Sequence, residues 1–166
     1  QGLRIPALGF GTMGLTGDNC VMAISSAFEI GYRHIDTAAN YGNETEVGQA
    51  IKNSNVSRDE IFLTTKVARD NLAIDDLTRS VDESLRKLAV DYVDLLLIHW
   101  PNPKIPLSDC LQGLARMKAA GKTRAIGVAN FPVAMLEESV EQHEVFLLCD
   151  QVEFHPFLSQ HRVLEF

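Results

Sequence analysis

The chain has 166 residues, of which 46% are hydrophobic and 22% are charged, with a formal net charge of −7 and a pI near 5.2. This composition is typical of a globular protein, and the length suggests one domain. The acidic balance argues against nucleic acid or an anionic membrane surface as a partner, because binding to either needs a basic patch. No apolar run reaches the ~20 residues that span a bilayer.

The cysteines and the scattered histidines give no sign of a metal centre. Cys20, Cys110 and Cys149 are odd in number, far apart and outside any metal-binding spacing. We expect reduced thiols, a cytoplasmic location and no bound metal. Structural or surface roles are expected for four histidines: His34, His143, His155 and His161.

Short apolar runs rich in β-forming residues alternate with longer stretches of helical periodicity along the chain. Strands are predicted at residues 7–11, 34–37, 61–65, 92–99, 125–129 and 151–154. Helices are predicted to begin near Asp18, Glu44, Ile74, Pro106, Pro132 and Ser159. Most units have ~30 residues, the size of a βαβ element, so the alternation predicts a parallel sheet covered by helices.

Two architectures fit this alternation, a doubly wound sheet and a (β/α)₈ barrel. The glycines of the segment 9–14, GFGTMG, do not have the Gly-x-Gly-x-x-Gly spacing that follows the first strand of dinucleotide-binding doubly wound folds. A barrel is therefore favoured. Because a closed barrel has eight strands, we expect residues 1–166 to form a single incomplete barrel domain with about six βα units, strands one to six.

Five polar residues each follow a hydrophobic run at the same relative place in the predicted units: Asp36, Lys66, His99, Asn130 and Gln151. In parallel α/β folds the chemistry gathers at the carboxyl ends of the strands. Neighbouring strands are ~4.8 Å apart, so the first three of these side chains should converge within about 10 Å on successive strands.

Tyr41, on the loop five residues after Asp36, completes a set of groups that could handle a proton. A nearby cation favours the phenolate form of tyrosine, and Lys66 would be that cation, held by Asp36. Tyr41 could then act as general acid, while His99 orients a carbonyl. Taken singly, these residues also fit a helix N-cap, a solvated lysine, a core histidine and a packed loop aromatic.

Segments spread over the whole chain resemble the aldo-keto reductase family. They are residues 31–44 (GYRHIDTAANYGNE), 65–67 (TKV), 97–101 (LIHWP), 126–131 (IGVANF) and 150–156 (DQVEFHP). The resemblance implies a (β/α)₈ barrel that reduces an aldehyde or ketone to an alcohol with NADPH. It implies Asp36, Tyr41, Lys66 and His99 as catalytic residues, with Tyr41 as general acid.

The resemblance also implies a cofactor site. Its residues would be Gly11, Thr12, Asp36, Asn130 and Gln151, with both amide side chains on the nicotinamide carboxamide. Amides suit that partner because each offers a donor and an acceptor.

Two positions depart from common family patterns, and both would border the cofactor or the substrate. Ala129 stands where serine is common, which removes one hydrogen bond to the carboxamide. Met13 stands where mammalian members often have tryptophan, and with Trp100 it is expected to line the substrate pocket. The local sequence is most similar to bacterial 2,5-diketo-gluconate reductases.

Other functions stay open at this point. The chain could be a non-catalytic cofactor-binding or regulatory member of the same superfamily, a truncated inactive fragment, or a different barrel enzyme such as a phosphate-binding isomerase. The family's strands seven and eight and its phosphate-binding loops would follow Phe166. We therefore expect the 166 residues alone to be inactive, and we expect a monomeric protein with a small carbonyl substrate.

Overall fold

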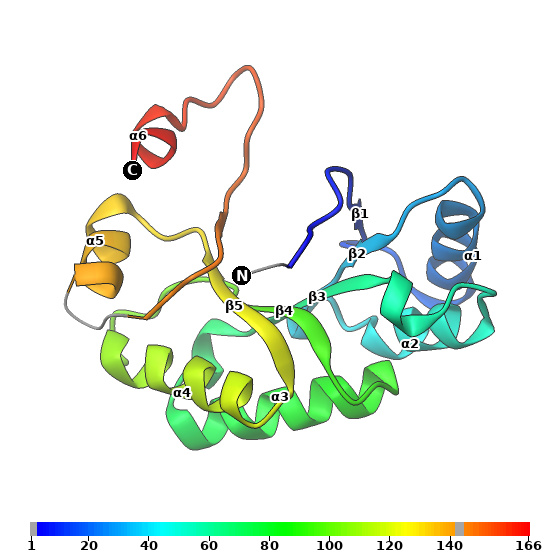
Figure 1. Cartoon of the computed structure of the whole chain (residues 1–166), viewed down its shortest axis with the longest axis horizontal. Helices are drawn as coiled ribbons and strands as arrows, with labels where there is room; N and C mark the ends of the chain where they lie inside the picture. The colour runs from blue at the N-terminus through cyan, green and yellow to red at the C-terminus, as the bar shows by residue number, and fades with distance from the viewer. Residues whose placement is uncertain (1–2, 142–144) are drawn as a thin grey trace.

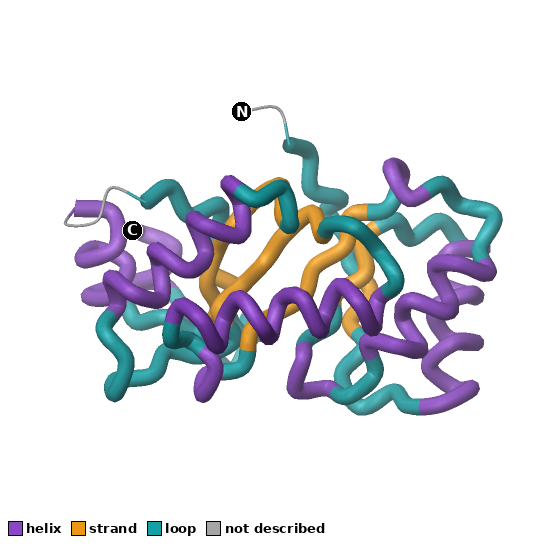
Figure 2. The backbone as a smooth tube through the Cα atoms, turned by 90° about the horizontal axis from the view of Figure 1, so that it is seen from below, coloured by secondary structure: helices purple, strands orange, loops and turns teal. Residues whose placement is uncertain are grey.

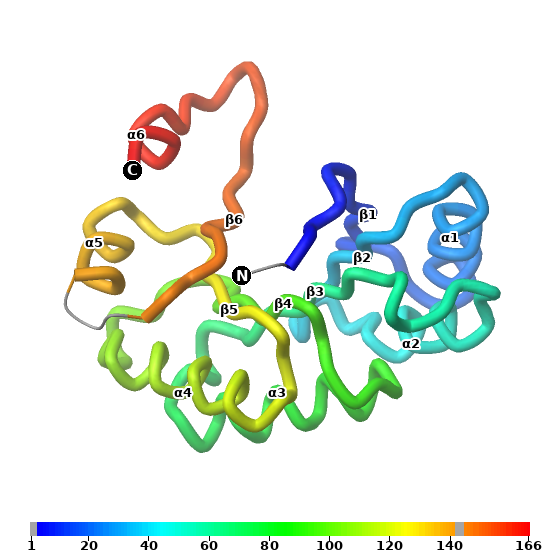
Figure 3. Tube along the Cα trace, viewed as in Figure 1, coloured from blue at the N-terminus to red at the C-terminus, as the bar shows by residue number. Residues whose placement is uncertain are grey.

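A single parallel sheet organises the computed structural model, which describes residues 3–141 and 145–166. Its six strands lie in the order β1-β2-β3-β4-β5-β6, so each strand neighbours the next one in sequence. The strands are β1 (Phe10–Gly11), β2 (His34–Asp36), β3 (Phe62–Val67), β4 (Val93–Ile98), β5 (Thr123–Ala129) and β6 (Asp150–Gln151). The trace in Figure 3 shows them following one another around a curled, open sheet.

Helices alternate with the strands and lie along the outside of the curl (Figures 1 and 2). The α-helices are α1 (Gly17–Glu29), α2 (Glu44–Asn53), α3 (Ile74–Leu88), α4 (Leu107–Ala119), α5 (Val133–Glu141) and α6 (His161–Glu165). Three 3₁₀ helices are η1 (Ala39–Tyr41), η2 (Arg58–Glu60) and η3 (Arg69–Asn71). The predicted parallel α/β architecture with six strands is confirmed. Among the described residues, no helix has the length and apolarity to cross a membrane.

The strand boundaries differ from prediction by one to a few residues, and two of these differences concern the site. β3 extends to Val67, so Lys66 lies inside the strand and not after it. β6 is only two residues long, whereas a strand was predicted at 151–154. The ladder between β5 and β6 ends at the pair Ala129↔Gln151. The residue after β5, Asn130, has a left-handed φ of 61° and therefore leaves the extended conformation. The predicted surface role of His143 lies outside the described residues.

The two faces of the sheet have different partners because side chains alternate along each strand. The outer face packs against the helices in a large apolar core that includes Leu63, Leu77, Leu96 and Val128. The inner face carries a smaller cluster formed by Phe62, Leu95, Leu97, Ala125 and Ala129. Lys66 has the same parity as Phe62 on β3, so its side chain belongs to the inner face.

Asp94 ties three neighbouring strands together near their amino ends. Its side chain is almost fully buried, and Oδ2 accepts the backbone N–H of Leu63 at 3.0 Å. The same oxygen pairs with Arg58 Nη2 at 2.9 Å, while Oδ1 pairs with Arg124 Nη1 at 3.0 Å. These contacts join β4 to the segments that begin β3 and β5, at the end of the sheet opposite the predicted site.

Replacing Asp94 by alanine should therefore destabilise the fold strongly. The change leaves two arginines and one backbone N–H without their acceptor, and we expect a loss of roughly 3 kcal/mol in the free energy of unfolding. Urea denaturation followed by circular dichroism measures it. Asp91→Ala is the matched control, because Asp91 is exposed only three residues away. Equal stability of the two variants would contradict a structural role for the Asp94 cluster.

Candidate active site

The ammonium group of Lys66 is the centre of the polar cluster at the carboxyl ends of the strands. Its side chain is 1% exposed and pairs with Asp36 Oδ1. Lys66 Nζ also donates to the backbone oxygen of Thr37 at 3.0 Å and lies 3.3 Å from the hydroxyl oxygen of Tyr41. An ammonium has three protons to donate, so these three acceptors fix its position.

The register of β2 and β3 brings Asp36 and Lys66 together. Asp36 is the last residue of β2 and lies opposite Thr64. Lys66 is two residues further along β3, on the same face as Thr64, and its long side chain reaches the carboxylate. Tyr41 ends η1, and Gly42 follows with a left-handed φ of 69°, which turns the chain into α2. That turn leaves the phenol beside the ammonium.

His99 comes directly after β4 and packs against Tyr41. The two rings meet edge to face, with centroids 5.5 Å apart. The backbone N–H of His99 donates to the oxygen of Val67 at 3.0 Å, which continues the ladder with β3. Burial lowers the pKa of His99, and the neighbouring Lys66 lowers it further. Since Nδ1 is buried without a hydrogen-bond partner among the described residues, the neutral ring is favoured, and Nε2 is the nitrogen left for a ligand.

Asn130 and Gln151 extend the cluster across β5 and β6. Asn130 adopts the left-handed conformation that asparagine tolerates better than most residues, and its Nδ2 donates to the backbone oxygen of His99 at 3.0 Å. Gln151 Nε2 donates to Asp36 Oδ2 at 2.8 Å. The structure therefore links all five predicted strand-end residues: Asp36, Lys66, His99, Asn130 and Gln151.

The loop after β1 forms another side of the site. Thr12 is fully buried, and its Oγ1 donates to the backbone oxygen of Asp36 at 3.0 Å. Gly11 is open, because a Cβ placed on it would have no atom within 4 Å. Met13 and Trp100 are 76% and 50% exposed. Their predicted place in the wall of a substrate pocket stays a prediction.

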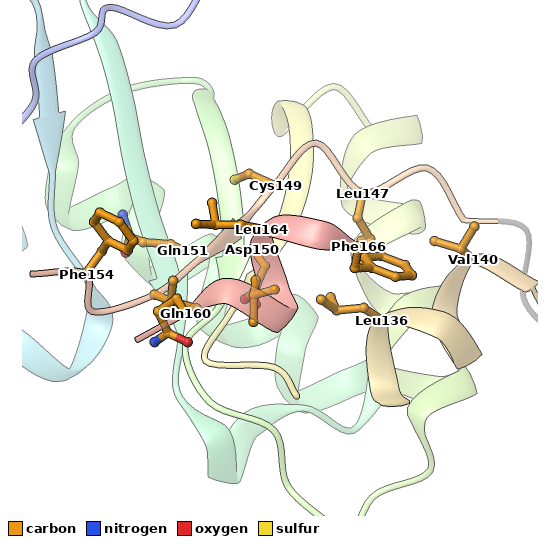
Figure 4. A pocket seen from close by; sticks show the side chains of 12 residues that line it. Leu136, Val140, Leu147, Cys149, Asp150, Gln151, Phe154, Gln160, Leu164 and Phe166 are labelled. Carbon is orange, nitrogen blue, oxygen red and sulfur yellow. The ribbon is translucent and has the colours of Figure 1, made fainter. Parts of the chain in front are cut away.

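A cavity of about 600 Å³ lies beside this cluster, between α5, β6 and α6 (Figure 4). Its lining is mainly apolar and includes Leu136, Leu147 and Phe166, while Gln151 connects it to the polar cluster. Asp150, also in the lining, accepts the N–H of Phe131 at 3.3 Å through Oδ1. Its Oδ2 is buried without a partner in the described part of the chain, and burial raises the pKa of this carboxyl to about 6.

Sequence reasoning assigned no role to four buried polar residues that surround the cluster: Thr37, Asn43, Glu44 and Thr65. Thr65 Oγ1 donates to Glu44 Oε1 at 2.6 Å, and Thr37 Oγ1 donates to Asn43 Oδ1 at 2.8 Å. Asn43 and Glu44 stand at the start of α2, where polar residues are usually read as exposed caps. The available signals were their place directly after Tyr41-Gly42 and the place of Thr65 next to Lys66. Within residues 3–141 and 145–166, no group of three or more His, Cys, Asp or Glu side chains could hold a metal ion.

Known structures share this arrangement of strands and helices. A crystal structure of an aldo/keto reductase from Brucella melitensis aligns over 99% of this chain and 63% of its own, with a TM-score of 0.95 and 41% identity. A putative 2,5-diketo-D-gluconic acid reductase B aligns over 97% of this chain and 57% of its own, with a TM-score of 0.93 and 46% identity.

Sequence comparison gives the same result. Methylglyoxal reductase DkgB of Salmonella typhi is 41% identical over 98% of this chain and 62% of its own length. Glyoxal reductase of Bacillus subtilis is 40% identical over 100% of this chain and 60% of its own. The chain thus spans about 60% of the length of such relatives. The pattern of the aldo/keto reductase family matches residues 7–166, and the chain therefore belongs to the aldo/keto reductase family.

Proposed function

We propose that the polypeptide carrying these residues reduces a small aldehyde or ketone to an alcohol, with NADPH as the hydride donor. The observation that carries the proposal is the position of Lys66 Nζ, which pairs with Asp36 and lies 3.3 Å from the Tyr41 hydroxyl. A phenol beside a fixed ammonium is suited to give up its proton, because the cation stabilises the phenolate that remains.

Tyr41 donates its proton to the carbonyl oxygen as the carbonyl carbon accepts a hydride. When bound, the reduced nicotinamide supplies that hydride. Asp36 holds the ammonium charged and in place, since a buried cation without a counter-ion is costly. Charge is balanced, because one hydride and one proton convert the carbonyl into an alcohol.

His99 orients the carbonyl before the proton moves. Its imidazole stacks edge to face on Tyr41, and burial lowers its pKa so that the ring is neutral near neutral pH. A neutral ring with its proton on Nε2 can donate one hydrogen bond to the carbonyl oxygen. That bond holds the oxygen beside the phenol and withdraws electron density from the carbon.

The residues present fit a nicotinamide dinucleotide. The amides of Asn130 and Gln151 each use one N–H on the described residues, which leaves a second N–H and an oxygen for a carboxamide. Gly11 leaves open space beside β1. A Bombyx mori aldo-keto reductase of known structure in complex with NADP is 35% identical over 97% of this chain, with a TM-score of 0.88. This relative supports NADPH as the cofactor.

Methylglyoxal and glyoxal are suitable first substrates, because two relatives are named for their reduction.

We also propose a cytoplasmic monomer. Cys20, Cys110 and Cys149 are free thiols, and burial raises the pKa of Cys110 and Cys149 to about 11. Thiols that stay protonated suit a reducing compartment and have no place in the proposed chemistry.

Replacing Tyr41 by phenylalanine should lower kcat by at least ~100-fold, because the ring packs as before but has no proton to give. NADPH consumption with methylglyoxal, measured on the complete polypeptide that carries these residues, tests this. Tyr92→Phe is the matched control, since Tyr92 lies beside Arg58 at the other end of the sheet. Full activity of Tyr41→Phe would exclude Tyr41 as the acid. An inactive parent protein that still binds NADPH would favour the non-catalytic alternative.

Replacing Asp36 by asparagine should lower kcat more than it weakens NADPH binding. A neutral amide can still accept a hydrogen bond but no longer supplies the counter-charge of the Lys66 ammonium, so we expect a fall of about tenfold or more in kcat and an altered pH–rate profile. Steady-state kinetics across pH and fluorescence titration of NADPH separate the two effects. If only the cofactor Kd changes, Asp36 acts as a ligand of the cofactor and not in proton transfer.

Replacing Ala129 by serine should tighten NADPH binding. Ala129 is buried on the inner face at the end of β5, where a hydroxyl could reach a carboxamide held by Asn130 and Gln151. The expected gain is one hydrogen bond, ~0.5–1.5 kcal/mol. Fluorescence titration measures it, with Ala125→Ser on the same strand and face as control. Unchanged or weaker binding would show that the missing hydroxyl is no deficit.

A further inference from the structure

Asn43 joins two segments that meet at the proposed site. Its Nδ2 donates to the backbone oxygen of Thr12 at 2.8 Å and to that of Leu15 at 2.9 Å. Both acceptors belong to residues 12–16, the β1–α1 loop. Its Oδ1 accepts the hydroxyl of Thr37 at 2.8 Å. Thr37 follows directly after β2, so one side chain bridges the ends of two neighbouring strands.

The orientation of this amide is unambiguous. A carbonyl oxygen can only accept, so the amide nitrogen faces Thr12 and Leu15 and the amide oxygen faces the threonine hydroxyl. Asn43 is fully buried, so its amide is shielded from solvent. Both N–H groups and one oxygen lone pair are therefore used within the protein.

The two bridged segments border the reacting groups. Thr12 donates through Oγ1 to the backbone oxygen of Asp36, and the backbone oxygen of Thr37 accepts from Lys66 Nζ at 3.0 Å. Met13, between the two carbonyls that Asn43 holds, is 76% exposed. A shift of the β1–α1 loop would thus move the side of the site formed by Gly11, Thr12 and Met13. The Asp36–Lys66 pair would stay in place, because both residues belong to strands.

We propose that Asn43 is a positioning residue that sets the β1–α1 loop against the strand ends and thereby shapes the edge where nicotinamide and substrate bind. This inference rests on the proposed reductase function for its kinetic consequence. Its structural part, the restraint of the loop, does not depend on that function.

Asparagine is the side chain that these contacts require. Aspartate has the same shape and keeps the acceptor for Thr37, but it places a second oxygen against two carbonyl oxygens. Alanine removes both N–H donors, so the Leu15 oxygen loses the amide and the Thr12 oxygen keeps only the backbone N–H of Leu15 at 3.1 Å. Asn43→Asp is consequently the sharpest variant, because it keeps the size of the side chain while it replaces the two N–H donors by an oxygen and adds a negative charge at a buried position.

The experiment compares Asn43→Asp with Asn55→Asp, the same chemical change at an exposed position, in the complete polypeptide that carries these residues. Hydrogen–deuterium exchange should become about tenfold faster or more in residues 12–16 of Asn43→Asp, since a local opening there costs less. With methylglyoxal, KM and the Kd for NADPH should rise about fivefold or more, while kcat changes by less than about threefold. The control should match the parent protein.

Two results would overturn the proposal. The first is hydrogen–deuterium exchange in residues 12–16 of Asn43→Asp equal to that of the parent protein. The second is faster exchange throughout the chain of Asn43→Asp with KM and Kd unchanged, which would mark a merely structural residue. If Asn43→Asp does not fold, Thr37→Val decides, because it removes only the hydroxyl that fixes the amide: faster loop exchange supports the proposal and unchanged exchange overturns it. A parent protein without turnover refutes the reductase function, and exchange still tests the loop.

Discussion

The buried ion pair between Lys66 and Asp36 is the constraint on which the rest of the site depends. Lys66 is 2% exposed, and an ammonium removed from water without a counter-ion costs several kcal/mol. The carboxylate of Asp36 and the backbone oxygen of Thr37 offset that cost. A lysine can occupy the inner face of β3 because β2 ends beside it with an acid, and the Tyr41 hydroxyl lies against the same ammonium.

The parallel sheet supplies the arrangement that this ion pair needs. Consecutive strands lie side by side, so residues separated by about thirty positions in sequence meet at one end of the sheet. The outer face is filled by apolar side chains packed on helices, which leaves the inner face for the polar cluster. At the amino ends, Asp94 joins three strands with its own charged network. The contacts of Asp94 thus hold these strands together at the end of the sheet opposite the site.

The alternation of strands and helices and the strand-end residues could be predicted because both depend on local patterns. The inclusion of Lys66 in β3 was missed, because a charged residue marks the end of an apolar run and the sequence does not show that its side chain is buried. The short β6 was missed because the left-handed turn at Asn130 cannot be recognised from a single asparagine. The bonds of Asn43 to Thr12 and Leu15 span 31 and 28 residues, and no sequence periodicity encodes such pairs.

The contact between Gln151 and Asp36 links the side chains proposed to bind the nicotinamide to the group proposed to support proton transfer. The pair is separated by 115 residues and has one N–H···O bond of 2.8 Å, and Asn130 holds the backbone of His99 in a similar way. The amides proposed to hold the nicotinamide therefore already contact Asp36, which is proposed to hold Lys66, and the backbone of His99, which is proposed to orient the carbonyl. A carboxamide that took over one of these N–H groups would gain one hydrogen bond and break another, each worth ~0.5–1.5 kcal/mol. Cofactor affinity and the geometry of the proton donor are then coupled, and a change at β6 would alter both.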